Sequence, residues 1–177
     1  MAAGRRYTDR FAHERAVEIY ARAQRFTVGP EEAARVERAV GDAFGTNGAA
    51  DDAWTHYLRA CELHRQAGSH PPAEMYPALV ELAVYHAGMF RQPPDPALVE
   101  TLLDEGQTVA RNTKDSASQA RLLAAHSFAS ADLQPLREAL GLFEAAADPL
   151  PFVPFLRRAA TLQIRAGALL DAERTLS

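Results

Sequence analysis

The chain has 177 residues, a formal net charge of −4, 47% hydrophobic residues and 24% charged residues. This composition is typical of a globular chain the size of one domain, which is long enough to bury a sizeable core. It contains no apolar run of the roughly 18 to 20 residues that a membrane span requires. The N-terminal segment lacks the apolar stretch of a signal peptide, and a single cysteine, Cys61, cannot form an internal disulfide.

These features predict one folded cytoplasmic domain without membrane association. Arginine far outnumbers lysine and alanine is abundant, which is typical of proteins from GC-rich bacterial genomes.

The first predicted helix runs from about Thr8 to Phe26, with Ala16, Tyr20 and Ala23 at helical spacing. It has the pattern of the second helix of a hairpin. The matching first helix is missing, so we expect the array to begin in the middle of a unit.

Residues 30–68 predict two helices folded back on each other. Pro30 stands at a first helical position and is followed by two carboxylates, which a helix N-terminus favours. Apolar residues then recur at three- and four-residue spacing and form one stripe: Ala33, Val36, Val40 and Ala43 or Phe44. The segment from Gly45 to Gly48 contains residues that accept positive φ, so we expect the chain to turn there.

The return helix follows at once and ends near Gly68, before two prolines. Its apolar positions are Ala50, Ala53, Trp54, Tyr57, Ala60 and Cys61. Small residues, Gly41 and Ala53, are expected opposite the large rings of Phe44 and Tyr57, so that the two backbones approach closely.

The order Val40-Gly41, Phe44, Gly48, Ala53, Tyr57, Ala60 resembles the tetratricopeptide repeat (TPR), in residue type and in spacing. The resemblance implies stacked antiparallel helix pairs that form a curved α-solenoid. The segment departs from the repeat pattern at two positions: Glu37 stands where an apolar residue is usual, and Arg65 stands where a closing proline is common.

The rest of the chain predicts further helices. One runs from Pro72 to Phe90 and is apolar on two sides, and Asp95-Pro96 provides the N-cap and first turn of the next. Later apolar stripes predict helices over residues 117–128, 133–147 and 152–166, and a last one begins at Leu169. No segment shows strand alternation.

We therefore expect an all-α, TPR-like α-solenoid of about eight to nine helices that forms a single domain over residues 1–177. Because it starts and stops within a helix pair, we expect it to be a fragment of a longer protein.

No catalytic centre is evident from the residue spacing. Cys61 and His64 lie one helical turn apart, but His56 lies well round the helix, so the ligands would converge poorly on a metal. The glycine-rich turn at residues 41–48 lacks the Gly-Lys-Ser/Thr of a phosphate loop. We predict no enzyme activity, no cofactor and no metal. An acidic chain without interleaved basic and aromatic residues also argues against nucleic-acid binding.

The predicted function is protein interaction or regulation, with a protein or peptide partner, other domains of the same polypeptide, or another copy of the chain. On the first helix of the 30–68 hairpin, residues off the core stripe would line the concave face: Arg35, Arg38, Asp42 and Thr46. The alternative is that they form only a solvated face. Some members of the family clamp a C-terminal carboxylate with a basic residue and an asparagine; Arg38 fits the first role, but Asp42 stands in place of the second.

In composition and residue spacing, the segment over residues 102–124 also resembles the helical repeat region of MalT/LuxR-type ATPase regulators and of multidomain nucleotide cyclases. This resemblance implies a sensor or scaffold part of a bacterial signal-transduction or transcriptional regulator. A different hypothesis is a small helical enzyme or small-molecule binder with an inter-helix pocket near His86. Its walls would be built from the following aromatic residues: Tyr85, Phe128, Phe143 and Phe155.

Overall fold

A computed structural model of the chain describes residues 13–24, 26–27, 29–165 and 167. These residues form eight α-helices and two short 3-10 helices: α2 (His13–Gln24), α3 (Pro30–Thr46), α4 (Ala50–Gln66), α5 (Met75–Tyr85), η1 (Ala87–Met89), α6 (Pro96–Thr113), α7 (Ser116–Ser130), α8 (Gln134–Glu144), η2 (Leu150–Phe152) and α9 (Val153–Arg165). The helix predicted to begin at Leu169 lies outside the described residues, as does the start of the first one.

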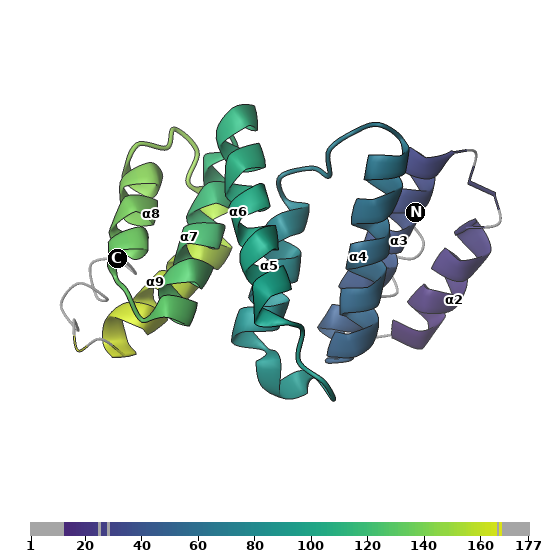
Figure 1. The fold of residues 1–177 in the computed structure, drawn as a ribbon, viewed down its shortest axis with the longest axis horizontal. Helices are drawn as coiled ribbons and strands as arrows, with labels where there is room; N and C mark the ends of the chain where they lie inside the picture. Colours follow the sequence, from purple (N-terminus) through teal and green to yellow (C-terminus); the bar gives the residue numbers. More distant parts are fainter. Residues whose placement is uncertain (1–12, 25, 28, 166, 168–177) are drawn as a thin grey trace.

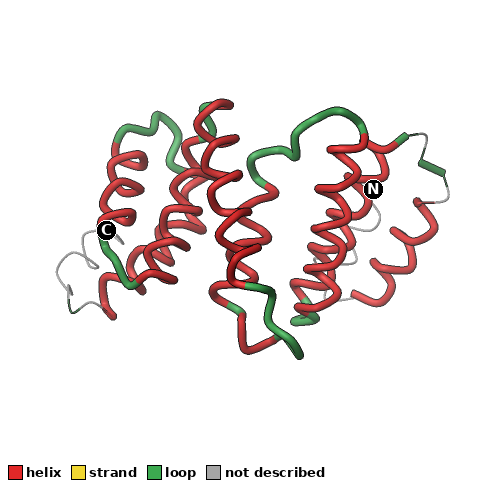
Figure 2. Tube along the Cα trace, in the orientation of Figure 1, coloured by secondary structure: helices red, strands yellow, loops and turns green. Residues whose placement is uncertain are grey.

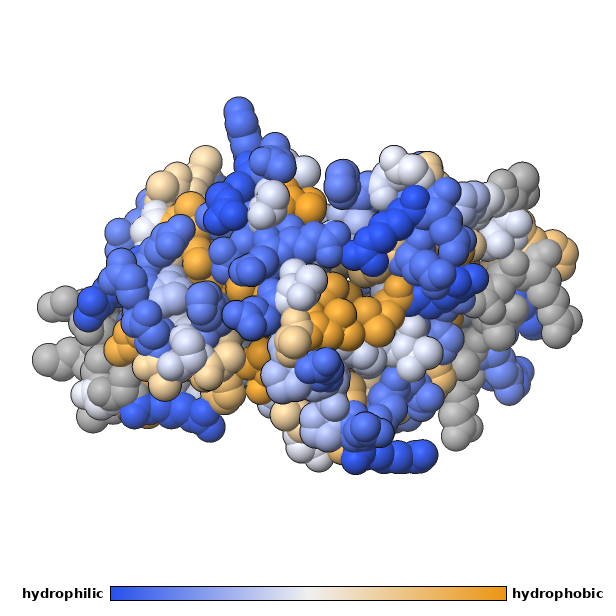
Figure 3. Space-filling view, in the orientation of Figure 1, coloured by the Kyte–Doolittle hydropathy of each residue, from blue (hydrophilic) through white to orange (hydrophobic). Residues whose placement is uncertain are grey.

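The helices follow one another along the long axis of the molecule, from α2 at one end to α8 and α9 at the other (Figure 1). Only helices and loops occur along the described trace (Figure 2), which confirms the all-helical fold. The face shown in Figure 3 is mostly hydrophilic, and hydrophobic side chains gather near its centre. Within the described residues, no helix combines the length and the apolar character needed to cross a membrane.

The predicted hairpin over residues 30–68 is present as α3 and α4. Pro30 occupies the first turn of α3 as expected, and Gly48 turns the chain with a φ of 78°. Gly41 lets the two helices approach, because a Cβ placed on it would lie 2.7 Å from the ring of Tyr57. The two faces of α3 are both covered, since Ala34 packs toward α4 and α5 whereas Val36 packs against Tyr20 of α2.

The next hairpin, α5 and α6, starts later than predicted. α5 begins at Met75, after a turn at residues 73–74, and ends at Tyr85. Pro77 fits within it because the first turn of a helix has no intrahelical acceptor for the missing N–H group. The prediction that this helix is covered on two sides is confirmed. Its buried residues are Met75, Tyr76, Pro77, Leu79, Val80, Leu82 and Ala83.

α7, α8 and α9 share a second core around Phe152 and Phe155. Both rings are at most 2% exposed, and burying a side chain of this size stabilises the fold by about 1.5 to 3 kcal/mol. In the turn before α7, Lys114 adopts a left-handed φ of 57°, and Asp115 caps α7 by accepting a hydrogen bond from Ser118 N at 3.0 Å.

Ion pairs join helices that are one repeat apart in the sequence. Arg38 contacts Glu74 across 36 residues. Arg65 of α4 binds Glu105 of α6, and Glu81 of α5 accepts two hydrogen bonds from Arg121 of α7, each pair spanning 40 residues. The stacking of successive hairpins is therefore held by polar contacts at their margins as well as by the apolar core.

Candidate functional site

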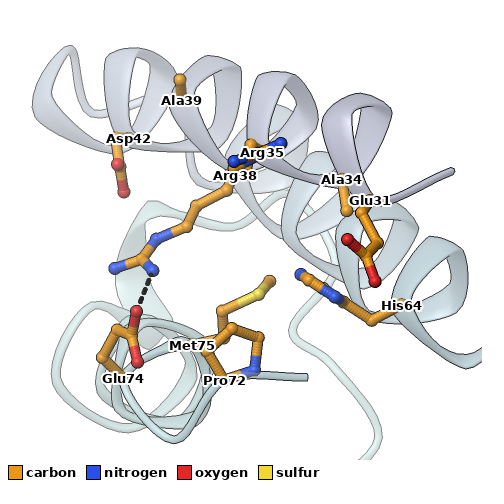
Figure 4. Close-up of a pocket in the computed structure, with 10 residues that line it drawn as sticks. All are labelled: Glu31, Ala34, Arg35, Arg38, Ala39, Asp42, His64, Pro72, Glu74 and Met75. Atoms are coloured by element: carbon orange, nitrogen blue, oxygen red, sulfur yellow. Dashed lines mark hydrogen bonds and ion pairs between the residues drawn. The ribbon is translucent and has the colours of Figure 1, made fainter. Parts of the chain in front are cut away.

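A cleft of about 480 Å³ lies between α3 and the start of α5, with the end of α4 at its side. We call it the α3–α5 cleft. Figure 4 shows its lining, in which Arg38 extends from α3 across the space to Glu74 at the start of α5. The residues that line it are Glu31, Ala34, Arg35, Arg38, Ala39, Asp42, His64, Pro72, Glu74 and Met75.

Three of the four residues that the sequence singled out lie in this cleft. Arg35, Arg38 and Asp42 project from successive turns of α3 and line it together. Thr46 is not among the lining residues, and its hydroxyl donates to the carbonyl oxygen of Asp42 at 2.8 Å. The structure thus brings three of these side chains to one surface, whereas the fourth bonds within its own helix.

The charges in the cleft are only partly neutralised. Arg38 Nη1 donates to Glu74 Oε1 at 2.8 Å, and the two side chains are 32% and 49% exposed. An ion pair this exposed is worth about 0 to 1 kcal/mol, so opening it for a ligand costs little. Arg35 is exposed and has no hydrogen-bond or ion-pair partner among the described residues.

Asp42 has a structural contact in addition to its place in the cleft. Its Oδ1 accepts a hydrogen bond of 2.9 Å from the hydroxyl of Tyr57 on α4. Burial of the phenol, followed by the charge of Asp42 and this hydrogen bond, raises the pKa of Tyr57 well above its usual value. The phenol therefore stays a donor and fixes the Asp42 carboxylate at the edge of the cleft.

His64 forms the side wall of the cleft near Glu31 (Figure 4). It is 9% exposed, and its Nδ1 lies 3.4 Å from the hydroxyl of Ser69. Burial lowers the pKa of His64, an effect that the charges of Glu31 and Glu74 oppose. The imidazole is thus neutral at pH 7 and offers the cleft a polar group without a charge.

Sequence reasoning missed the contribution of the α4–α5 junction. Pro72, Glu74 and Met75 complete the cleft, and Glu74 lies 36 residues from its partner Arg38. The pattern of either helix carries no signal for this pairing. A search for opposite charges one repeat apart could have found it.

The two departures from the repeat pattern both make side-chain polar contacts to another helix. Glu37 Oε2 lies 2.6 Å from His56 Nδ1, and the ring of His56 stacks on Phe44 at 5.3 Å. Arg65 makes two hydrogen bonds to Glu105, at 3.0 and 2.8 Å. The first pair links α3 to α4 and the second links α4 to the next hairpin, so both positions still serve helix packing.

Among the aromatic residues proposed for a pocket near His86, Phe128, Phe143 and Phe155 belong to the second core, whereas Tyr85 packs against the α3–α7 core and touches Phe128. Tyr85 packs edge-on against Phe128 at 5.0 Å and lies under Arg158 at 4.3 Å, whereas Phe143 and Phe155 pack around Phe152 in the second core. His86 itself follows the last residue of α5, half-buried, with Nε2 3.5 Å from Arg158 Nη2. The α3–α5 cleft is lined by other residues, and a ligand near His86 stays a prediction.

Cys61 is fully buried, and this burial raises the pKa of its thiol to about 11. A thiol that stays protonated at neutral pH is a poor nucleophile and a poor metal ligand. Within the part of the chain that the structure describes, no three His, Cys, Asp or Glu side chains are grouped so that they could share a metal ion.

No family model and no curated protein matches the chain. The solved structures that resemble it include a Podosopora anserina protein described as a kinesin light chain with nearly identical TPR-like repeats. A variant of that protein matches with a TM-score of 0.67 and 15% identity, over 99% of this chain and 88% of that one. A second structure of it matches with a TM-score of 0.58 and 16% identity, over 99% and 89%.

At such identities the likeness concerns the fold, and it confirms the TPR-like helical repeat. The resemblance of residues 102–124 to MalT/LuxR-type regulators and nucleotide cyclases stays a prediction.

Proposed function

We propose that this TPR-like chain is a non-catalytic protein-interaction module that binds a peptide segment of a partner in the α3–α5 cleft. The observation that carries the proposal is Arg35, which has no hydrogen-bond or ion-pair partner among the described residues. It lies beside the exposed Arg38–Glu74 pair in a cleft of about 480 Å³. Stacked helix pairs present such surfaces on a rigid frame, which lowers the entropy lost on binding.

The charges of the cleft define the peptide that fits it. Arg35 offers a planar cationic group to an acidic side chain, and guanidinium–carboxylate pairs are frequently bidentate. Glu31 and Asp42 stand on either side of it along α3 and would favour a basic residue next to the acidic one. We therefore expect a segment of alternating charge to bind better than a purely acidic or purely basic one.

We also propose that the module acts in the cytoplasm as the sensor or scaffold part of a larger bacterial regulator, and that residues 1–177 form one domain of it. The support is the resemblance of residues 102–124 described above. Sequencing the gene on both sides of codons 1–177 tests the proposal of a larger regulator. A nucleotide-binding module encoded in frame with the repeats would support it. In-frame stop codons directly before and directly after these codons would contradict it.

The binding proposal is tested by selecting peptides from a random display library on the full chain and measuring their affinity by fluorescence polarisation. Arg35→Met should weaken binding about tenfold, the equivalent of roughly 1.4 kcal/mol. The matched control is Arg59→Met, since Arg59 is an exposed arginine of α4 outside the cleft. Equal loss in both variants, or no selected peptide at all, would show that the cleft is not a peptide site.

A further inference from the structure

A second cleft lies where the last turns of α5 and α7 meet the first turns of α6. Pro93, Pro94 and Pro96 form one of its walls, and we call it the proline cleft. Its volume is about 470 Å³, within the range of about 300 to 1,000 Å³ in which proteins hold small organic ligands. None of its lining residues belongs to the α3–α5 cleft.

The body of the proline cleft is apolar and rigid. Val84 of α5 and Val99 and Leu103 of α6 line it together with the prolines. Proline rings have a fixed φ and no χ freedom to lose, so little conformational entropy is lost when a ligand enters. The cleft is therefore suited to an apolar group of a ligand.

Two carboxylates border this apolar space. Glu100 and Asp104 are exposed, both line the cleft, and neither has a hydrogen-bond or ion-pair partner within the described residues. They lie four residues apart on α6, hence on the same face, where two like charges repel and destabilise the helix. A cation bound between them would remove that repulsion.

Two helix ends add negative potential at the same place. Val84 and Ser130 line the cleft from the last turns of α5 and α7, where carbonyl groups without intrahelical partners form the negative end of the helix dipole. The opposite effect of the N-terminus of α6 is offset by Asp95, which accepts a hydrogen bond from Ala97 N at 3.0 Å. His126 is the remaining titratable group at the cleft.

We propose that the proline cleft binds a small organic amine. The apolar body of the ligand would lie against Val84, Val99 and Leu103, and its ammonium group would lie between the carboxylates of Glu100 and Asp104. This site is separate from the peptide cleft, so either proposal can hold without the other.

The test compares three probes with the same apolar body: phenylbutylammonium, phenylbutanol and phenylbutanoate. Each is titrated into the full chain at neutral pH, and binding is followed by amide NMR spectra. The ammonium should bind at least about tenfold more tightly than the alcohol, a difference of roughly 1.4 kcal/mol, and the carboxylate should bind most weakly. The shifted amides should lie at residues 99–104 and 126–130.

Two variants separate the charge from the shape of the cleft. The double substitution Glu100→Gln, Asp104→Asn should abolish the preference for the ammonium and leave the alcohol unaffected. Ala129→Leu, at an exposed position that lines the cleft, should weaken all three probes by filling the space. Glu138→Gln removes one charge from an exposed site on α8 and should change nothing, because Glu138 does not line the cleft.

Four results would overturn the proposal. One is equal affinity for the three probes, and another is the absence of binding up to their solubility limits. The third is a dimer in sedimentation velocity that Ala129→Leu dissociates, which would show that a second copy of the chain occupies the cleft. Shifts at residues 34–42 would place the amine in the α3–α5 cleft and would also contradict it.

Discussion

In the α3–α4 hairpin, a glycine of the first helix packs against a tyrosine of the second. In the α5–α6 hairpin the order is reversed, with the tyrosine on the first helix and the glycine on the second. Gly41 of α3 faces Tyr57 of α4, and Tyr76 of α5 faces Gly106 of α6. A Cβ on Gly41 would lie 2.7 Å from ring atoms, and one on Gly106 would lie 2.5 Å from the Cβ of Tyr76.

The polar end of each tyrosine repeats the same arrangement. The hydroxyl of Tyr57 donates to Asp42, next to Gly41, and the hydroxyl of Tyr76 donates to Glu105, next to Gly106, both at 2.9 Å. The carboxylate follows the glycine in α3 and precedes it in α6. Each phenol therefore crosses a glycine and ends on a carboxylate of the facing helix.

Close helix packing in the two hairpins thus depends on a complementary pair of residues and not on the order of that pair along the chain. A glycine opposite a ring gives the same interhelical approach whichever helix carries it. A family signature that specifies the order recognises the α3–α4 hairpin and misses the α5–α6 hairpin. The small/large pair of the second hairpin escaped sequence analysis for this reason.

The largest effect is expected for Gly106→Ala. The added methyl group would meet the Cβ of Tyr76 and, at 3.0 Å, a methyl group of Leu122, so backbone must move. Overpacking of this kind costs about 1 to 3 kcal/mol, and the better helix propensity of alanine recovers about 1 kcal/mol. We expect a net loss of up to about 2 kcal/mol in the free energy of unfolding, measured with urea.

Truncating the partner tests the cause of that loss. Tyr76→Ala keeps its Cβ, so adding Gly106→Ala to it should still destabilise the protein. A double variant that regains the loss would show that the ring, and not the backbone approach, sets the contact.

Gly41→Ala should be milder, at about 1 kcal/mol, because the ring of Tyr57 can turn away from the new methyl group. The effect of Gly41→Ala on stability should depend on the side chain at position 57. In a Tyr57→Ala background the clash is gone, and Gly41→Ala should stabilise α3 by up to about 1 kcal/mol through helix propensity. A double-mutant cycle measures the coupling, and equal coupling in the two hairpins would contradict the difference described here.

Removing the phenol oxygens should have similar, moderate effects in both hairpins. Tyr57→Phe and Tyr76→Phe each delete a hydrogen bond to a carboxylate that water can still reach, so we expect a loss of about 1 kcal/mol apiece. Chemical denaturation of the two variants measures it. A loss of stability in only one variant would show that the tyrosine–carboxylate hydrogen bond stabilises one hairpin and not the other.

The smallest effect concerns His64, which lies between the two hairpins. Because burial lowers the pKa of His64 in the folded state, the unfolded chain binds the proton more readily near its usual pKa of about 6.5. The contribution of His64 to stability is therefore present above that pH and is lost as the pH falls through the lower folded value. His64→Gln should flatten the decline in thermal stability between neutral and mildly acidic pH, and an unchanged slope would contradict it.

Local patterns determined most of the fold. The 3.6-residue apolar period predicts each described helix, and Asp95, the Pro30 turn and the Gly48 turn mark ends that the structure confirms. These signals are readable because periodicity and capping depend on residues a few positions apart. The helix predicted over Pro72–Phe90 is shorter in the structure, Met75–Tyr85. Pro72 has the pattern of a first helical position, but residues 73–74 form a turn.

What the sequence by itself determined is the set of helices, the TPR-like pairing of α3 with α4, and the face of α3 that carries Arg35, Arg38 and Asp42. The tertiary structure alone decided which residues meet across repeats. Glu74 reaches Arg38 and Arg121 reaches Glu81 only because successive hairpins stack. Contacts over 36 and 40 residues depend on the angle and offset between packed helices, which no local pattern encodes.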